Sequence, residues 1–364
     1  MKRKTTIPGS VGVSRRQFLR TAGAGAASLA LAAAGCSLFG KGASEKPGNS
    51  SPADGDSKPE PLISISNEPS DKWRFGGHRT DWLYQAKWGV MFHYVYSIRM
   101  DNPSYEKWDQ RIKAFDVSGL ADQLASVGAG YFLLSLAQGP PPNSPNSVYD
   151  KYATNMPKPR SMTRDLIADA SAALAKKGIS LMVYSPGGAP GVVAAEPKFF
   201  PDWWPDALRE YSHRWGKGVR GWWFDGFSKP EERNRILSEA VRSGNPDALC
   251  AFNRPHGFRR NSIYEDYTSG DTPHVPDAEC NGRFVDNCQW HMLSFLAFLW
   301  GHCVRKTDTP RYPTEFVAET TRKLVSAGGV VTWDVPALVS GLVPEKYVAQ
   351  LAAIGKELKG IKRS

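Results

Sequence analysis

From about residue 73 onward, short apolar runs alternate with amphipathic stretches, and this alternation constrains the fold more than any other feature of the sequence. Apolar runs of about four to eight residues are typical of buried strands, and the amphipathic stretches between them are typical of helices covering a parallel sheet. Eight runs are predicted to be strands: Trp88–Tyr96, Tyr131–Leu136, Ile179–Tyr184, Val219–Phe224, Ala248–Phe252, Ile263–Tyr267, Phe298–Cys303 and Val330–Trp333.

The stretches between these runs include clear helical patterns, which are Gly119–Val127, Thr163–Lys177, Glu231–Ser243, Phe316–Ser326 and Lys346–Leu358. Eight strand–helix units in one chain of this length fit an α/β protein of the (β/α)8 TIM-barrel type. We therefore expect residues 71–364 to form a single barrel domain. In such barrels the reactive groups gather at the carboxyl ends of the strands.

Polar side chains follow most of the predicted strands directly. They are His93, Gln138, Tyr184, Asp225, Arg254 and Asp334. Each residue alone would be unremarkable, because every strand must end in something polar. Together they predict one polar ring around one pocket.

Asp225 is the carboxylate with the most informative surroundings. It follows Trp222, Trp223 and Phe224 and precedes Gly226, in a chain with 12 tryptophans. A carboxylate that leaves an apolar strand among aromatic rings suits a carbohydrate site, where rings stack on sugar faces. The alternative is an Asx-type turn, which Asp-Gly also favours.

Several segments as a set resemble the family 29 α-L-fucosidases over roughly residues 73–360. The segments are Lys87–Ser97, Gly128–Leu134, Arg164–Ser185, Trp223–Gly226, Asn253-Arg254, Trp300-Gly301 and Phe316–Leu358. The resemblance implies a retaining glycosidase without cofactor or metal, in which Asp225 is the nucleophile. On this basis His93, Tyr184, Trp223, Arg254 and Trp300 are expected to bind the substrate. Gln138 is expected to bind it as well, because its amide can donate and accept hydrogen bonds. For His93 and Arg254 a purely structural role, as a core histidine and an ion-pair partner, stays open.

The acid/base residue is expected from the segment Tyr264–Asp271, with Asp271 at the matching position and Glu279 as runner-up; either could instead be a solvated loop carboxylate. The chain departs from the family after the second predicted strand, where Gln138 and three prolines replace paired histidines. The family's C-terminal β-sandwich is also not expected. The alternative interpretation is a carbohydrate-binding lipoprotein with a degenerate, non-catalytic barrel.

The first 36 residues are predicted to direct export. Arg15 and Arg16 precede a small-residue apolar stretch, which resembles a twin-arginine signal read by the export machinery. The stretch ends in Ala34-Gly35-Cys36, which resembles a lipoprotein processing site that would leave Cys36 lipidated and the protein anchored to a membrane outside the cytoplasm. A frayed helix and an ordinary signal-peptidase cut are the alternatives.

Residues 37–70 are rich in Gly, Ser, Pro and charged residues and are expected to form a disordered linker. The net charge of +10 does not predict nucleic-acid binding, because six basic residues and no acid fall within residues 1–35 and the remaining charges form no runs. The cysteines show no spacing typical of a zinc site, and no disulfide framework is predicted.

Overall fold

The computed structural model describes residues 78–96, 103–191, 200–226, 231–253, 257–301 and 309–363. The predicted export signal, Cys36, the linker and Arg254 lie outside these ranges. All described residues belong to one compact unit, which runs from residue 65 to the end of the chain.

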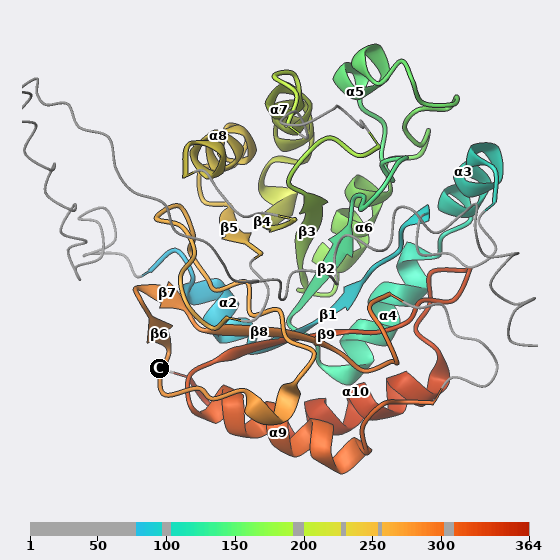
Figure 1. Cartoon of the computed structure of the whole chain (residues 1–364). Coiled ribbons are helices and arrows are strands. Elements are labelled where there is room, and N and C mark those ends of the chain that lie inside the picture. Colours follow the sequence, from blue (N-terminus) through green and yellow to red (C-terminus); the bar gives the residue numbers. More distant parts are fainter. Residues whose placement is uncertain are drawn as a thin grey trace, which may run out of the picture. The chain divides into compact units, whose positions relative to one another are not determined.

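A seven-stranded sheet forms the centre of this unit, and all neighbouring strands in it run parallel (Figure 1). The strand order is β5-β4-β3-β2-β1-β9-β8. The strands are β1 (Trp88–Phe92), β2 (Tyr131–Ser135), β3 (Ser180–Pro186), β4 (Val219–Asp225), β5 (Leu249–Phe252), β8 (His291–Phe295) and β9 (Val330–Asp334). A short antiparallel hairpin, β6 (Phe284–Val285) and β7 (Cys288–Gln289), precedes β8. This sheet is consistent with the predicted TIM-like barrel.

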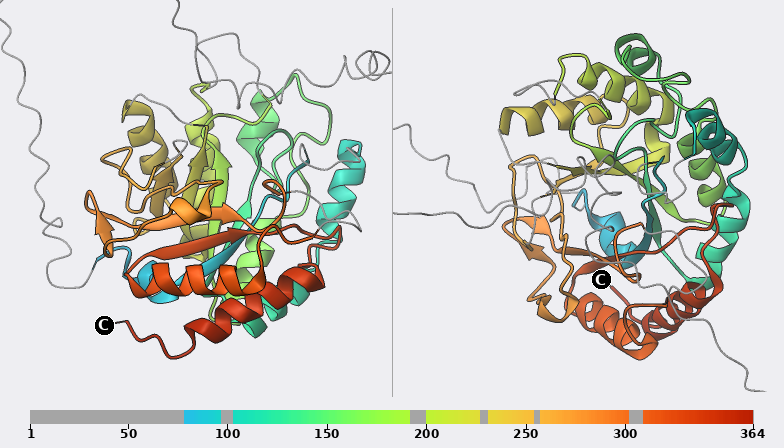
Figure 2. Two further views of the ribbon diagram at one scale, coloured as in Figure 1. Left: turned by 60° about the horizontal axis from the view of Figure 1, so that its bottom comes forward. Right: turned by 45° about the vertical axis from the view of Figure 1, so that its right-hand side comes forward.

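Helices cover the outside of the sheet, as Figure 2 shows from two directions. They are α3 (Tyr105–Lys113), α4 (Val117–Val127), α5 (Ser147–Tyr152), α6 (Leu166–Ala175), α7 (Trp204–Trp215), α8 (Glu231–Arg242), α9 (Thr314–Ser326) and α10 (Glu345–Leu358). The short helix α2 (Asp81–Ala86) lies elsewhere, at one end of the sheet. Side chains of aspartates at two helix starts accept backbone N–H bonds: Asp116 caps α4 and Asp165 caps α6. No helix in the described part of the chain combines the length and apolar character that a bilayer crossing needs.

The core has two layers because successive strand residues point to opposite faces. Val90 and Phe92 of β1 join the large apolar layer between sheet and helices, whereas Met91 joins a smaller cluster inside the sheet. Leu83 of α2 belongs to the inner cluster as well. The short helix α2 therefore packs into the end of the barrel where the strands begin.

Between β5 and β8 the sheet is completed by an irregular segment in place of the predicted sixth strand. Residues 263 and 264 form a turn, and parallel bridges occur later, between Tyr267 and Gln289 and between Asp271 and Leu293. The physical reason is the buried carboxylate of Glu265, whose oxygens accept backbone N–H bonds from Phe252, Asn261 and Ser262 and so hold the chain in a turn. The prediction of a strand at Ile263–Tyr267 is therefore wrong.

The seventh predicted strand was also misplaced. The described residues of Phe298–Cys303, up to Gly301, form bends and a turn in which Phe298 is 80% exposed. The strand is instead β8, seven residues earlier, where His291 interrupts the apolar pattern that usually marks a buried strand. Four helices, α2, α3, α5 and α7, were not among the predicted ones. The last of them lies in a Trp- and Pro-rich stretch with proline in its first turn.

Candidate active site

Two carboxylates lie side by side at the carboxyl ends of the strands. Asp225 is the last residue of β4, and Asp271 pairs with β8 in the segment that follows β5. The side-chain nitrogen of Asn253 donates to Asp225 Oδ1 at 2.9 Å and to Asp271 Oδ2 at 2.8 Å. These two oxygens therefore lie no farther apart than about 5.7 Å, the sum of both bonds. Both aspartates are partly accessible.

A buried tyrosine, Tyr184, forms a hydrogen bond to Asp225. The hydroxyl of Tyr184, at the corresponding end of β3, donates to Asp225 Oδ2 at 2.5 Å, and the Gly226 N–H donates to Oδ1 at 2.8 Å. Burial, followed by the negative charge of Asp225, raises the pKa of Tyr184 well above its usual value. The phenol therefore stays protonated and remains a hydrogen-bond donor at neutral pH.

His93, which follows β1, is held in place by Asp334, the last residue of β9. Its Nδ1 lies 3.0 Å from Asp334 Oδ1, and its backbone N–H donates to the same oxygen at 3.3 Å. The second oxygen of the fully buried Asp334 accepts the Gly301 N–H at 2.7 Å. Because Asp334 holds Nδ1, the Nε2 edge of the imidazole is left to face other groups.

Aromatic rings connect these polar groups. The His93 ring lies 4.8 Å from the ring of Tyr184 and 5.6 Å from that of Trp300. Tyr184 in turn stacks on Trp223 at 5.3 Å, and the Trp223 indole N–H donates to the Ser269 carbonyl at 3.0 Å. Trp223 is 2% exposed and Trp300 is half-buried. Trp223 thus forms the base of the site, while Trp300 stands at its edge.

The structure thus brings together six of the predicted residues, which are Asp225, Asp271, His93, Tyr184, Trp223 and Trp300. Gln138 is exposed beyond the end of β2. The runner-up acid Glu279 is exposed and lines a cleft of about 730 Å³ whose lining includes neither Asp225 nor Asp271. Its position does not favour a shared role with Asp225.

Three further residues organise the site: Asp334, which the sequence placed in the polar ring without assigning it a role, and Asn253 and Gly301, which were not predicted. The signal for the first two was present, because each directly follows a predicted strand. Nothing in the sequence showed that one amide would bridge two carboxylates. Among the described residues no group of three or more His, Cys, Asp and Glu side chains is arranged to hold a metal ion.

Comparison with solved structures shows what the fold is similar to. An endo-fucoidan hydrolase from glycoside hydrolase family 107 superposes with a TM-score of 0.61 at 16% identity, over 77% of this chain and 54% of that one. The α-L-fucosidase from Lactobacillus casei, in complex with α-L-fucose, gives 0.57 at 14% identity, over 76% and 97% of the two chains. An α-L-fucosidase isoenzyme from Paenibacillus thiaminolyticus gives 0.57 at 15% identity, over 77% and 75%.

This chain has the fold of those hydrolases. The glycoside-hydrolase barrel expected from the sequence is thereby confirmed as a fold. The chain spans about half the length of the fucoidan hydrolase, 54%. Protein-family models give no match, and neither do curated proteins.

Proposed function

We propose that this chain is a retaining glycoside hydrolase that cleaves a terminal α-L-fucose or a related sugar. The observation that carries the proposal is the pair Asp225 and Asp271, whose nearest bonded oxygens are held within about 5.7 Å by one amide nitrogen. Retaining enzymes place their two carboxyl groups about 5–5.5 Å apart, whereas inverting enzymes need about 6.5–9.5 Å to admit a water molecule. The spacing supports the retaining mechanism.

In the proposed reaction Asp225 is the nucleophile. Among the described residues, its Oδ1 accepts two hydrogen bonds and its Oδ2 accepts one, from Tyr184, so Oδ2 keeps more room to attack the anomeric carbon. As this bond forms, the bond to the leaving-group oxygen breaks and Asp271 donates its proton to that oxygen. A water molecule then attacks the glycosyl ester, Asp271 takes the water proton, and Asp225 is released.

His93 and Trp300 are proposed to orient the sugar. Asp334 occupies Nδ1 of His93, which leaves Nε2 to bond a hydroxyl, and the neighbouring Trp300 ring offers an apolar surface to a sugar face. The likeness in fold to enzymes described as α-L-fucosidases and fucoidan hydrolases supports a fucose-like substrate. The predicted role of Arg254, outside the described residues, belongs to the same proposal.

Covalent trapping tests the proposal directly. We expect 2-deoxy-2-fluoro-L-fucosyl fluoride to add one fluorofucosyl group, and peptide mapping to place it on Asp225. NMR of the first product released from 4-nitrophenyl α-L-fucopyranoside should show the α-anomer. Labelling of another carboxylate, or release of the β-anomer first, would contradict the mechanism.

A panel of aryl glycosides distinguishes the enzyme from the non-catalytic alternative. If calorimetry shows that the protein binds fucose but no glycoside of the panel is hydrolysed, the protein is a carbohydrate-binding lipoprotein instead.

We also propose that the protein is exported through the twin-arginine machinery and anchored through Cys36. The support is the sequence of residues 14–36. Cys36→Ala should release the protein from the membrane fraction with its hydrolase activity intact, and replacing Arg15 and Arg16 by lysine should block export. Recovery of Cys36→Ala in membranes, or normal export of the double variant, would contradict the respective assignment.

A further inference from the structure

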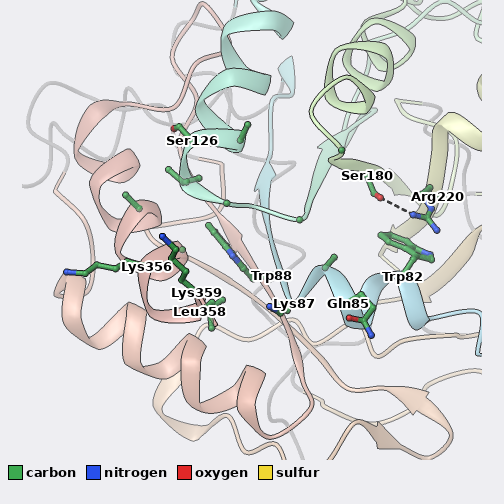
Figure 3. Close-up of a pocket in the computed structure, with 18 residues that line it drawn as sticks. Trp82, Gln85, Lys87, Trp88, Ser126, Ser180, Arg220, Lys356, Leu358 and Lys359 are labelled. Atoms are coloured by element: carbon green, nitrogen blue, oxygen red, sulfur yellow. Dashed lines mark hydrogen bonds between the residues drawn. The ribbon is translucent and has the colours of Figure 1, made fainter. Parts of the chain in front are cut away.

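A second cleft, of about 900 Å³, lies at the opposite end of the barrel from the carboxylate pair (Figure 3). Trp88 and Ser180, which begin β1 and β3, line it, as does Arg220 near the start of β4. Asp225 lies at the other end of β4. Because the strands run parallel, the cleft and the proposed active site occupy opposite ends of the sheet.

The lining of this cleft carries positive charge without negative charge. Four of its residues are basic, Lys87, Arg220, Lys356 and Lys359, and none is acidic. No ion pair joins any of the four to a carboxylate within the described ranges. Acidic groups nearby are paired with other cations, in Asp122–Lys177, Asp81–Arg283 and Glu357–Arg322.

On one side of the cleft, Arg220 forms a cation–π contact with Trp82. The guanidinium of Arg220 lies 4.3 Å from the centre of the Trp82 ring and donates to Ser180 Oγ at 3.2 Å. Trp82 is itself held edge-to-face against Tyr131. Partial burial lowers the pKa of Arg220. Figure 3 shows Trp82, Ser180 and Arg220 grouped together.

The other side contains a strained lysine. Lys87 ends α2 with a φ of 68°, a backbone conformation that costs a non-glycine residue free energy. Burial and the positive charge of Arg363 lower the pKa of Lys87. Arg363 donates to the carbonyls of Val325 and Gly329, and no carboxylate among the described residues forms an ion pair with it. An anion bound here would relieve this repulsion.

We propose that this cleft binds an acidic glycan, a sugar chain carrying sulfate or carboxylate groups. Cations supply the attraction, Gln85, Ser126 and Ser180 offer hydrogen bonds to hydroxyls, and the half-buried indole ring of Trp82 offers apolar surface. The volume is at the upper end of the range of about 300–1,000 Å³ typical of small-ligand sites. The hydroxyl-bonding and aromatic groups favour a glycan over the flat surface of an anionic bilayer.

Binding of the full chain to dextran sulfate tests this site, with uncharged dextran as the matched polymer. In the cleft variant Arg220→Gln/Lys356→Gln/Lys359→Gln, we expect the Kd for dextran sulfate to rise at least about tenfold at low salt. The difference should shrink as added salt screens the charges. A control variant, Lys107→Gln/Lys217→Gln/Lys323→Gln, removes the same charge from exposed lysines outside the cleft and should change the Kd much less.

Two further measurements keep the outcomes distinct. The cleft variant should hydrolyse an uncharged aryl fucoside at the same rate as the parent, because the cleft lies at the opposite end of the sheet from Asp225. Dextran sulfate binding does not depend on hydrolysis, so it tests the cleft even if the parent hydrolyses no fucoside. Equal affinity of parent and cleft variant for dextran sulfate would overturn the proposal. So would a loss confined to vesicles containing phosphatidylglycerol, because the ligand would then be a lipid headgroup.

Discussion

Asp225 and Asp271 accept hydrogen bonds from the same nitrogen, Nδ2 of Asn253. One amide thus sets the distance between two carboxylates from separate segments of the barrel. The two aspartates should nevertheless respond differently to substitution, because the proposed reaction gives them different roles.

Asp225→Asn is expected to lower kcat on 4-nitrophenyl α-L-fucopyranoside by at least about 10³-fold, because an amide cannot form the glycosyl ester. The fold should persist, since asparagine can still accept from Tyr184. Circular dichroism and thermal unfolding check this point. Asp247→Asn, which changes an exposed aspartate before β5, is the matched control and should turn over like the parent. If Asp225→Asn kept the kcat of the parent, Asp225 would be excluded as the nucleophile.

Asp271→Asn is expected to depend on the leaving group. Substrates with poor leaving groups need the proton and should slow by about 10²–10⁴-fold, whereas activated aryl glycosides should slow far less. Azide should partly rescue this variant and give a product whose configuration matches the substrate, because azide replaces water in the second step. An equal loss on both kinds of substrate, without rescue, would remove Asp271 from the acid/base role.

Tyr184→Phe removes the hydroxyl that donates to Asp225 Oδ2. Loss of a hydrogen bond to a charged group costs about 1.5–3 kcal/mol, so kcat/KM should fall by about tenfold to a hundredfold. Because the pKa of Tyr184 is raised well above 10, its ionisation adds no limb to the pH profile of the parent below that value. Parent and variant should therefore share the shape of their pH–rate curves, and a basic limb lost in the variant would contradict this assignment.

Gly301→Ala tests the support of His93. Gly301 has a φ of 59°, and an added Cβ would stand 2.1 Å from the Cβ of His93. We expect displacement of His93 or Trp300 and a raised KM. Gly178→Ala is the matched control, because its φ of 70° imposes similar strain while an added Cβ meets nothing within 4 Å. It should cost about 1 kcal/mol of stability and leave KM unchanged; equal KM values for both variants would show that Gly301 does not position the site.

His291 should make stability depend on pH. Its Nδ1 bonds the Thr268 carbonyl and its Nε2 bonds Thr332, and burial lowers the pKa to about 4 from 6.5. The unfolded chain therefore binds a proton more readily between these values. The stabilisation, on the order of 3 kcal/mol, is complete above pH 6.5 and is lost as the pH falls towards 4.

Urea unfolding at pH 7.5, 5.5 and 4.5 checks this prediction. In His291→Gln the free energy of unfolding should be lower at pH 7.5 and should change less between 7.5 and 4.5 than in the parent. Identical slopes in the two proteins would show that another group causes the acid sensitivity.

Local pattern in the sequence predicted the parallel α/β fold and six of the seven strands of its central sheet, because strands buried on both faces must be apolar and their covering helices amphipathic. It also placed Asp225 and His93 correctly at strand ends, whereas Tyr184 lies two residues before the end of β3. These features are local, since each depends on a run of a few residues. The apolar pattern did not predict β8, which begins with the polar residue His291. It also wrongly predicted a strand at Ile263–Tyr267, where the buried carboxylate of Glu265 holds the chain in a turn.

Only the tertiary structure decided which polar groups meet. Asn253 bridges Asp225 and Asp271, and Asp334 orients His93, across distances in the sequence that no spacing rule encodes. The charged cleft at the other end likewise combines Lys87, Arg220 and Lys359 from separate segments. Hydrogen bonds and electrostatic fields act through space over a few ångströms, so they become defined only when the sheet brings its strand ends together.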